Sequence, residues 1–246
     1  MDLTFSLDRT DHCATLPDDF ATVVEQKGDR FRDDFTRFCL YLASKNITVG
    51  DASLETVVVG TEYGNLDAML RLQRAVMAGE PPVSAQQFPH STTSSASTFL
   101  NLGNGITGGN ITLNSGALTP VFALLQALLH VNSVRGGGAH VMVGDVYCAE
   151  AVEDVAKKAA NRSVHDGVTY FNVRDGKTHR AEFHFGDLAG ETDASFSDAA
   201  DAEWNRALLT HRFLIAVSEL AVGEKAALAL SSGERSATVT VRRVLA

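Results

Sequence analysis

The pattern of apolar and polar positions along the chain predicts strands and helices in alternation. Short β-branched runs and segments in which apolar and polar residues alternate are typical of strands, whereas apolar residues three or four positions apart are typical of helices. The expected strands are residues 3–7, 57–60, 110–114, 139–145, 226–230 and 237–241. The expected helices are residues 29–45, 66–77, 118–131, 150–160 and 204–220. Strands and helices that alternate in this way predict an α/β fold.

The segment 118–131 differs from the other helices because apolar residues occupy almost every position of it. A helix without a polar face is expected to be buried on every side. The segment follows a short strand, 110–114, and a tight bend at residues 115–117, and the strand 139–145 comes after it. Strand, helix and strand in this order indicate a right-handed βαβ unit. We therefore expect a βαβ-layered mixed sheet with a buried central helix.

Two further segments are expected to add to this sheet. Residues 168–173 and 179–185 alternate between apolar and polar positions and flank a run of Arg, Asp, Gly and Lys at 174–177. This pattern is typical of a β-hairpin. Residues 187–203 contain several acidic side chains and no Lys or Arg, which favours a solvated loop over a docking site. An inserted hairpin and an acidic loop are therefore predicted.

Composition narrows the possible functions. The 246 residues carry a formal net charge of −9, which argues against nucleic acid as a partner because phosphate binding needs a positive field. The longest apolar run is interpreted as too short and too interrupted to span a membrane. The N-terminus lacks a secretion signal, so we expect a cytoplasmic protein. The three cysteines, Cys13, Cys39 and Cys148, suit neither a metal site nor a disulfide framework, and no metal or cofactor is predicted.

The bend before the central helix is the first candidate for chemistry. Free amides and the helix dipole at a helix N-terminus favour an anion or a thiolate. The residue at the tip of the bend is Ala117, which has no nucleophilic atom. Ser115 and Cys148 are weaker candidate nucleophiles, because no Ser-His-acid pattern surrounds Ser115 and a buried, inert cysteine is the favoured interpretation of Cys148. Structural roles are expected for the histidines at positions 90, 130, 140 and 211.

Five segments resemble a known series of motifs in order and spacing. They are residues 57–64 (Val-Val-Val-Gly-Thr-Glu-Tyr-Gly), 88–91 (Phe-Pro-His-Ser), 105–113 (Gly-Ile-Thr-Gly-Gly-Asn-Ile-Thr-Leu), 139–145 and 223–230. The series resembles the N-terminal half of the β-ketoacyl synthases, the condensing enzymes of fatty-acid and polyketide assembly, which have the thiolase fold. The resemblance implies a single domain over residues 1–246 with an insertion at about 161–215.

The same resemblance implies a chain without condensing activity. Family members place a nucleophilic cysteine at the bend, where this chain has Ala117. Their two catalytic histidines lie in the C-terminal half, and the chain is expected to end where that half begins. By resemblance, the chain is a pseudoenzyme similar to the chain-length factors of type II polyketide synthases. It resembles more closely the short ketosynthase-like proteins of aryl-polyene-type gene clusters.

The resemblance also implies a partner. In ketosynthase dimers the strand before the bend pairs with its counterpart across the two-fold axis; here that strand comprises Asn110, Ile111, Thr112, Leu113 and Asn114. Phe88 and Phe99 are expected to reach the partner's acyl tunnel and to limit its depth. The predicted partner is an active ketosynthase in a heterodimer, with acyl carrier protein engaged indirectly. Two alternatives stay open: a homodimer that binds acyl carrier protein or an acyl chain, and an acyl-thioester hydrolase or transferase that uses Ser115 or Cys148.

Overall fold

The computed structural model describes residues 2–25, 27–79, 84–159, 162–187, 194–198 and 203–245. Its strands are β1 (Asp2–Cys13), β2 (Glu55–Gly60), β3 (Asn110–Leu113), β4 (Gly138–Asp145), β5 (Ser163–Val164), β6 (Gly167–Asp187), β7 (Phe196–Ser197), β8 (Glu203–Trp204), β9 (Lys225–Ser232) and β10 (Arg235–Arg243). Its α-helices are α1 (Phe20–Val23), α2 (Asp34–Asn46), α3 (Leu66–Met77), α4 (Ser95–Asn104), α5 (Thr119–Ser133), α6 (Ala149–Lys158) and α7 (Arg206–Glu219). Single 3₁₀ turns lie at Asp29–Phe31 and Phe88–His90.

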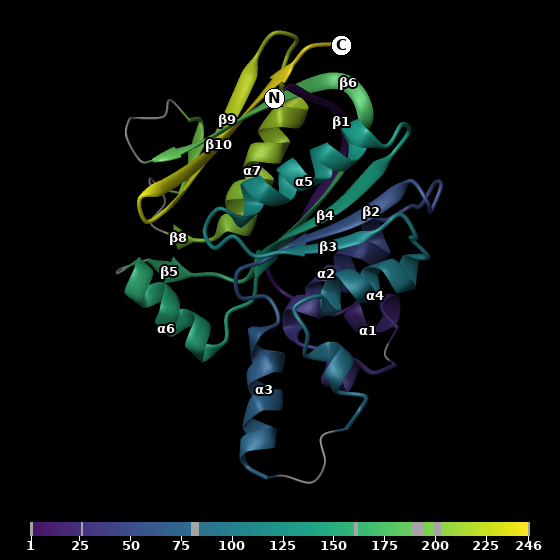
Figure 1. Ribbon diagram of the computed structural model, residues 1–246, viewed down its shortest axis with the longest axis vertical. Coiled ribbons are helices and arrows are strands. Elements are labelled where there is room, and N and C mark those ends of the chain that lie inside the picture. Colours follow the sequence, from purple (N-terminus) through teal and green to yellow (C-terminus); the bar gives the residue numbers. More distant parts are fainter. Residues whose placement is uncertain are drawn as a thin grey trace.

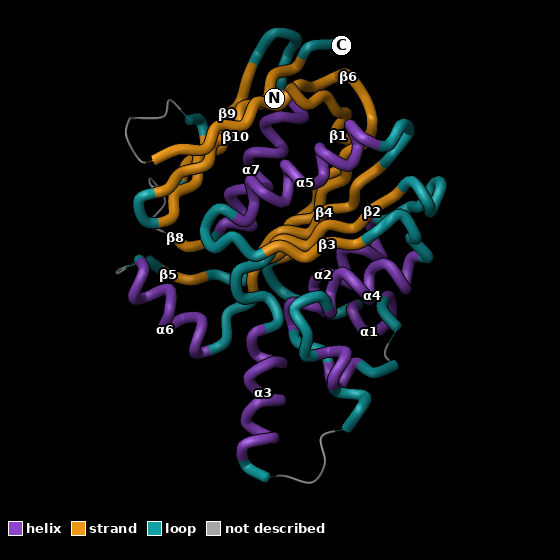
Figure 2. The backbone as a smooth tube through the Cα atoms, in the orientation of Figure 1, coloured by secondary structure: helices purple, strands orange, loops and turns teal. Residues whose placement is uncertain are grey.

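One large mixed sheet organises the molecule, as the sequence predicted. Its strands follow the order β3-β2-β4-β6-β10-β9-β7, and β1 pairs with β6. The strands β3, β2 and β4 run parallel to one another, which fits the predicted βαβ unit with α5 as its crossover helix. The first part of β6 pairs with β4 and the second part with β10. The sheet therefore opens at β6 into two arms, as Figures 1 and 2 show.

Two helices, α5 and α7, lie side by side between the arms (Figure 1). Their apolar faces share one core with the inner faces of β4, β6, β9 and β10. A second core joins α2 and α4 to the outer face of β2, β4 and β6. The sequence predicted one buried central helix. The structure adds α7 to the same layer.

The predicted hairpin is wrong. Residues 167–187 form the single strand β6, because β1 pairs with it on both sides of the predicted turn, at residues 168–174 and 179–182. Phe5 lies opposite His179 and the next residue, Ser6, lies opposite Arg174. The turn-forming residues 175–178 are therefore extra residues that bulge from a continuous strand, and Gly176 allows this because a Cβ there would overlap Ser6.

The segment 161–215 was expected to be an insertion. Its described part supplies β6, at the centre of the sheet, and most of α7 in the inner layer, so it contributes to the body of the fold. Part of the predicted acidic loop, residues 188–193 and 199–202, lies outside the described residues. Asp198 is not solvated as predicted: it is buried and accepts hydrogen bonds from the backbone N–H and hydroxyl of Ser231, each at 3.2 Å.

The sequence analysis interpreted the longest apolar run as too short and too interrupted to span a membrane, and the structure corrects this. The segment Gly116–Ser133 is long and apolar enough, by length and composition alone, to cross a membrane. In this fold it packs between the arms of the sheet, and Val121, Ala127 and Leu128 are fully buried there. The composition of α5 is therefore that of a core helix.

Candidate functional site

The carboxyl ends of the three parallel strands β2, β3 and β4 lie together, beside the N-terminus of α5. Ligands of open α/β sheets commonly bind at the carboxyl ends of the strands. A cleft of about 460 Å³ opens there. It is lined by Glu62, Gly116, Ala117, Lys158, Ala159, Arg162, Asp198, Trp204, Ser231, Ser232 and Gly233.

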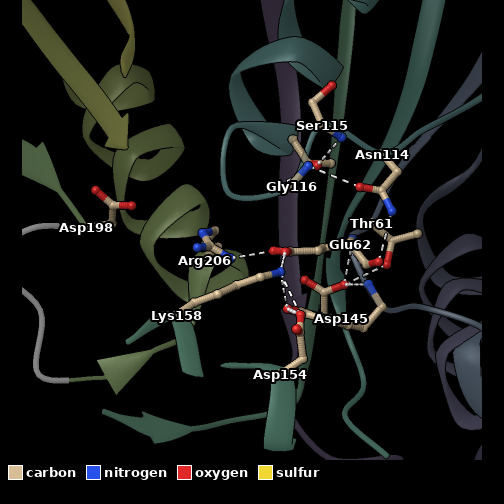
Figure 3. Close-up of polar contacts among 12 residues, drawn as sticks. Thr61, Glu62, Asn114, Ser115, Gly116, Asp145, Asp154, Lys158, Asp198 and Arg206 are labelled. Carbon is tan, nitrogen blue, oxygen red and sulfur yellow. Dashed lines mark hydrogen bonds and ion pairs between the residues drawn. The ribbon is translucent and has the colours of Figure 1, made fainter. Parts of the chain in front are cut away.

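The bend between β3 and α5 forms the floor of this cleft, and local hydrogen bonds fix its shape (Figure 3). Gly116 has a φ of 56°, a left-handed conformation that glycine adopts readily. Its N–H donates to the side-chain oxygen of Asn114 at 3.0 Å. The Thr119 hydroxyl accepts from the Ser115 N–H at 2.9 Å and donates to the Gly116 carbonyl at 2.7 Å. Ala117 therefore presents a buried methyl group, 6% exposed, at a rigid position.

An ion-pair cluster forms one wall of the cleft (Figure 3). One carboxylate oxygen of Glu62 lies 2.8 Å from Lys158 Nζ, and the other lies 3.0 Å from Arg206 Nη1. Lys158 also pairs with Asp154 at 2.6 Å. Glu62 and Arg206 are almost fully buried, with side-chain exposures of 8% and 5%. The cluster thus joins the end of β2 to α6 and to the first residue of α7.

Asp145, at the end of β4, holds the neighbouring turn in place. One of its oxygens accepts from the Thr61 hydroxyl at 2.7 Å and from the backbone N–H groups of Glu62 and Tyr63 at 2.8 and 2.7 Å. Burial away from water raises the pKa of the Asp145 carboxyl to about 6, although these hydrogen bonds oppose the shift. Asp145 therefore orients Glu62 toward the cleft.

Neither of the weaker candidate nucleophiles has the surroundings of a catalytic group. Ser115 lines a separate groove between α5, β6 and β10, together with Leu118, Phe122, Phe185, Gly186, Arg235 and Ser236. Cys148 is the N-cap residue of α6 and packs against the apolar cluster around Tyr63. Within the described residues, neither side chain forms a hydrogen bond to a histidine or a carboxylate, which is the arrangement that activates a nucleophile.

Three of the four candidate histidines lie within hydrogen-bond distance of a structural partner, as predicted. His130 lies 2.9 Å from the Leu54 carbonyl, and His140 lies 2.9 Å from the Tyr170 hydroxyl. His211 lies 3.2 Å from the Thr10 hydroxyl. The remaining candidate, His90, stacks on Phe99 with 4.6 Å between the ring centroids.

The predicted interface strand lies at the edge of the sheet. The Val57 N–H donates to the Gly109 carbonyl and the Thr61 N–H to the Leu113 carbonyl, at 3.1 and 3.0 Å. Since backbone groups alternate in direction along a strand, those of Asn110 and Thr112 point to the open edge. Within the described part of the chain, no other strand pairs with this edge.

The two predicted tunnel residues differ in their surroundings. Phe88 is 64% exposed in the turn before α4. Phe99 is half-buried in α4, stacks on His90 and lies beneath the Arg32 guanidinium, which is 5.9 Å from the centre of its ring. Phe99 therefore packs within its own chain, whereas Phe88 is available to a second molecule.

One stripe of α5 is less buried than the sequence predicted. Phe122, Leu125 and Leu129 are only half-buried, although they contact the core. They lie on the same helix as the fully buried residues, so α5 is closed on most sides but not on all. A stripe of large apolar side chains left partly open is typical of a surface that a second molecule covers.

Comparison with known proteins identifies the fold of this chain through solved structures. No protein-family model matches the chain, and no curated protein matches it. Among solved structures, a chain of the ishigamide ketosynthase/chain length factor has a TM-score of 0.69 and 16% identity, over 92% of this chain and 85% of that one. The chain has a thiolase-like ketosynthase fold.

Two other structures share this fold. The ketosynthase ApeO in complex with its chain length factor ApeC, from Xenorhabdus doucetiae, matches with a TM-score of 0.65 and 12% identity, over 97% of this chain and 99% of the aligned chain. A β-ketoacyl synthase from Burkholderia phymatum matches with a TM-score of 0.67 and 10% identity, over 94% and 86% of the two chains. The sequence resemblance was to one half of a condensing enzyme, whereas these matched chains are covered over most of their length.

The residues of the cleft wall were not predicted as a site. Glu62 lies in the motif at residues 57–64, directly after a buried strand, and a polar residue at such a strand end was a usable signal. Lys158, Trp204 and Arg206 gave no comparable signal. Lys158 and Trp204 reach the cleft, and Arg206 reaches Glu62, only because α6, α7 and the chain before α7 fold back toward the end of β2.

Proposed function

We propose that the chain is a non-catalytic, chain-length-factor-like subunit that pairs with an active ketosynthase and shapes its acyl pocket. It would act in the cytoplasm, in a type II polyketide or fatty-acid-like system of chain elongation. Acyl carrier protein would dock mainly on the ketosynthase. The fold is that of structures that contain a ketosynthase with its chain length factor.

The observation that carries this proposal is the buried methyl group of Ala117 at the tip of the bend. The resemblance assigns this position to a cysteine that accepts the acyl chain. A methyl group forms no thioester, and the hydrogen bonds around Gly116 and Thr119 hold the bend in place without one. A rigid bend without a nucleophile supports a role through contact with a partner.

The open edge of β3 and the stripe on α5 supply the surface for that contact. An unpaired strand edge is a template for a strand of another molecule. Phe122, Leu125 and Leu129 offer partly open apolar area on the neighbouring helix. A specific heterodimer typically buries about 1,600 Å² in total, which requires more than a four-residue strand. The open edge of β3 and the stripe on α5 together form the core of the proposed interface.

The helix α3 and the turn after it add further apolar surface. Val76 and Met77 are 62% and 79% exposed, and Phe88 is 64% exposed. In Figure 1, α3 projects away from the body of the molecule. An amphipathic helix with an apolar face in water is favoured only when something covers that face. We assign these side chains to the ketosynthase contact.

Co-expression with a ketosynthase tests the proposal. Any ketosynthase whose gene lies beside the gene for this chain is the first candidate partner. The readout is co-elution of the two proteins in size-exclusion chromatography. The variant Thr112→Pro removes an N–H donor at the open edge, so we expect at least about tenfold weaker association, since each lost interchain hydrogen bond and its strain cost about 1 kcal/mol or more. Thr112→Val is the matched control: it keeps the N–H and loses only the hydroxyl contact to Ser97 at 2.8 Å.

Three outcomes separate the alternatives. A complex that is lost in Thr112→Pro and kept in Thr112→Val supports the proposal. A homodimer that excludes the ketosynthase and retains acyl carrier protein would support the binding-module alternative. Hydrolysis of an acyl thioester by the purified chain, abolished in Ser115→Ala or Cys148→Ala, would support the hydrolase alternative and contradict the proposal.

A further inference from the structure

The guanidinium group of Arg206 uses only part of its hydrogen-bonding capacity. Nη1 donates to Glu62 at 3.0 Å, whereas Nε and Nη2 are buried without a hydrogen-bond partner in the described part of the chain. The side chain is 5% exposed. The two free nitrogens form one complete edge of the guanidinium, the edge that binds both oxygens of a carboxylate or phosphate. A buried donor pair without an acceptor is costly.

A third unpaired donor lies against the same group. The indole N–H of Trp204 is also buried without a partner, again within the described residues. The Arg206 guanidinium lies 3.7 Å from the centre of the Trp204 ring. Trp204 itself lines the cleft at the bend, and Arg162 lies over its ring at 5.7 Å. The cleft wall therefore carries the Arg162 guanidinium and the Trp204 indole, and the Arg206 guanidinium packs against Trp204 behind that wall.

The acidic side chains of the wall already have partners. Both oxygens of Glu62 are paired with cations. Asp198 accepts two hydrogen bonds from Ser231. The unmet hydrogen-bonding capacity at Arg206 and Trp204 thus consists of donors. An acceptor with two or three oxygens would satisfy it.

We propose that the cleft above Ala117 is a binding site for an oxyanion, a carboxylate or phosphate group, held by the free edge of Arg206 and the indole N–H of Trp204. The long side chain of Arg162 adds positive charge at the same wall. The cleft of about 460 Å³ leaves room for the organic part of such a ligand over Ala117. Because the three donors are shielded from solvent, binding is expected to shift the Trp204 ring.

The single tryptophan of the chain makes this proposal directly testable. Trp204 is the only tryptophan, so intrinsic tryptophan fluorescence reports on this wall alone. The purified full-length chain is titrated with sodium phosphate and, separately, with sodium acetate, each against sodium chloride at matched ionic strength. We expect a saturable fluorescence change with at least one oxyanion and not with chloride. The two arms distinguish a phosphate group from a carboxylate.

Arg206→Lys is the decisive variant. Lysine keeps the charge that pairs with Glu62 but lacks the guanidinium edge, so oxyanion affinity should fall by roughly tenfold. Arg71→Lys, at an exposed arginine on α3 that pairs with Asp67 at 3.0 Å, is the matched control and should bind as the unaltered chain does. If Arg206→Lys does not fold, Trp204→Phe followed by calorimetry tests the loss of the indole donor.

The outcomes are distinct from those of the ketosynthase test, because only the isolated chain is used. A linear signal equal to that of chloride in the unaltered chain overturns the proposal. Saturable binding that Arg206→Lys and Trp204→Phe leave unchanged would place the anion elsewhere and would also overturn it. Binding that weakens in these variants and persists in Arg71→Lys supports it, whatever the result with a ketosynthase.

Discussion

A buried glutamate lies at each end of strand β2, Glu55 on its first residue and Glu62 two residues after its last, and the surroundings of the two differ. At the amino end, Glu55 is 2% exposed, lies 2.9 Å from Arg174 and faces the ring of His140 at 3.2 Å. Just beyond the carboxyl end, Glu62 pairs with Lys158 and Arg206. Both sites place a carboxylate between basic side chains. Glu62 lines the cleft above Ala117.

Packing explains this difference. Gly138 lies against the Glu55 carboxylate so closely that a Cβ at this position would overlap it. On the other side, His140 Nδ1 contacts the Tyr170 hydroxyl at 2.9 Å and the Asn172 amide at 3.2 Å. Its Nε2 faces Glu55 Oε2 at 3.2 Å without a hydrogen bond between them. The amino end is therefore a closed polar core. Buried polar atoms without a hydrogen bond occur at both ends among the described residues, but those at the carboxyl end belong to Trp204, which lines the cleft, and to Arg206, which packs against it. Buried charge alone therefore does not identify a binding site.

The largest effect is expected at the closed end. Arg174→Ala leaves the Glu55 carboxylate buried with only a neutral histidine beside it, since burial lowers the pKa of His140. Removing one partner of a buried ion pair typically costs about 3 kcal/mol. We expect a loss of this size in the free energy of unfolding, measured by urea denaturation at pH 7.

A double variant supplies the control. Glu55→Gln together with Arg174→Ala removes the isolated charge, so part of the lost stability should return. If Arg174→Ala costs less than about 1 kcal/mol, the amino-end pair behaves as a surface pair and the contrast with the cleft is wrong.

The two ends should also respond to pH with opposite sign. The pKa of Asp145 is raised to about 6 in the folded chain, against about 3.9 in an unfolded one. The folded state therefore binds more protons between these values, and stability is lost as pH rises through 6. Asp145→Asn keeps the accepting oxygen without the charge. It should match the unaltered chain near pH 4 and exceed its stability by about 2 kcal/mol at pH 8.

His140 at the other end provides the comparison. Its lowered pKa means that the folded state binds fewer protons than the unfolded one, so its contribution is lost as pH falls below the ordinary histidine range. The loss of stability at acidic pH should therefore be smaller in His140→Gln than in the unaltered chain. The slope of stability against pH near pH 8 should be the same in both. Urea unfolding across pH 4–8 measures both variants, and parallel profiles for Asp145→Asn and the unaltered chain would contradict the assignment.

Much of the fold could be predicted from local pattern. The β-branched run at residues 57–60, the apolar strand at 139–145 and the helical period at 66–77 all correspond to elements of the structure. Each of these signals lies within a few consecutive residues. The short strand at 110–114 was also found, as β3, because its alternation and the bend after it are local.

The errors arose where distant segments determine the outcome. The turn residues at 174–177 signalled a hairpin, but pairing with β1 keeps β6 continuous. The site depended on the same kind of information. Glu62 and Arg206 are 144 positions apart in the sequence, and no periodicity connects them. The position of α7 beside α5, which brings them together, is a property of the tertiary fold.

The smallest effect is expected from Lys158 in the cleft wall. Its side chain is 47% exposed, and Glu62 keeps its buried partner Arg206 when it is removed. Lys158→Ala should therefore cost only about 0.5–1 kcal/mol in urea unfolding, the range of a partly exposed ion pair. Lys157→Ala, at the preceding position of α6, is the control for loss of helix charge. A cost for Lys158→Ala as large as that for Arg174→Ala would mean that the cleft wall is as closed as the amino end. The unpaired edge of Arg206 would then be part of a structural core.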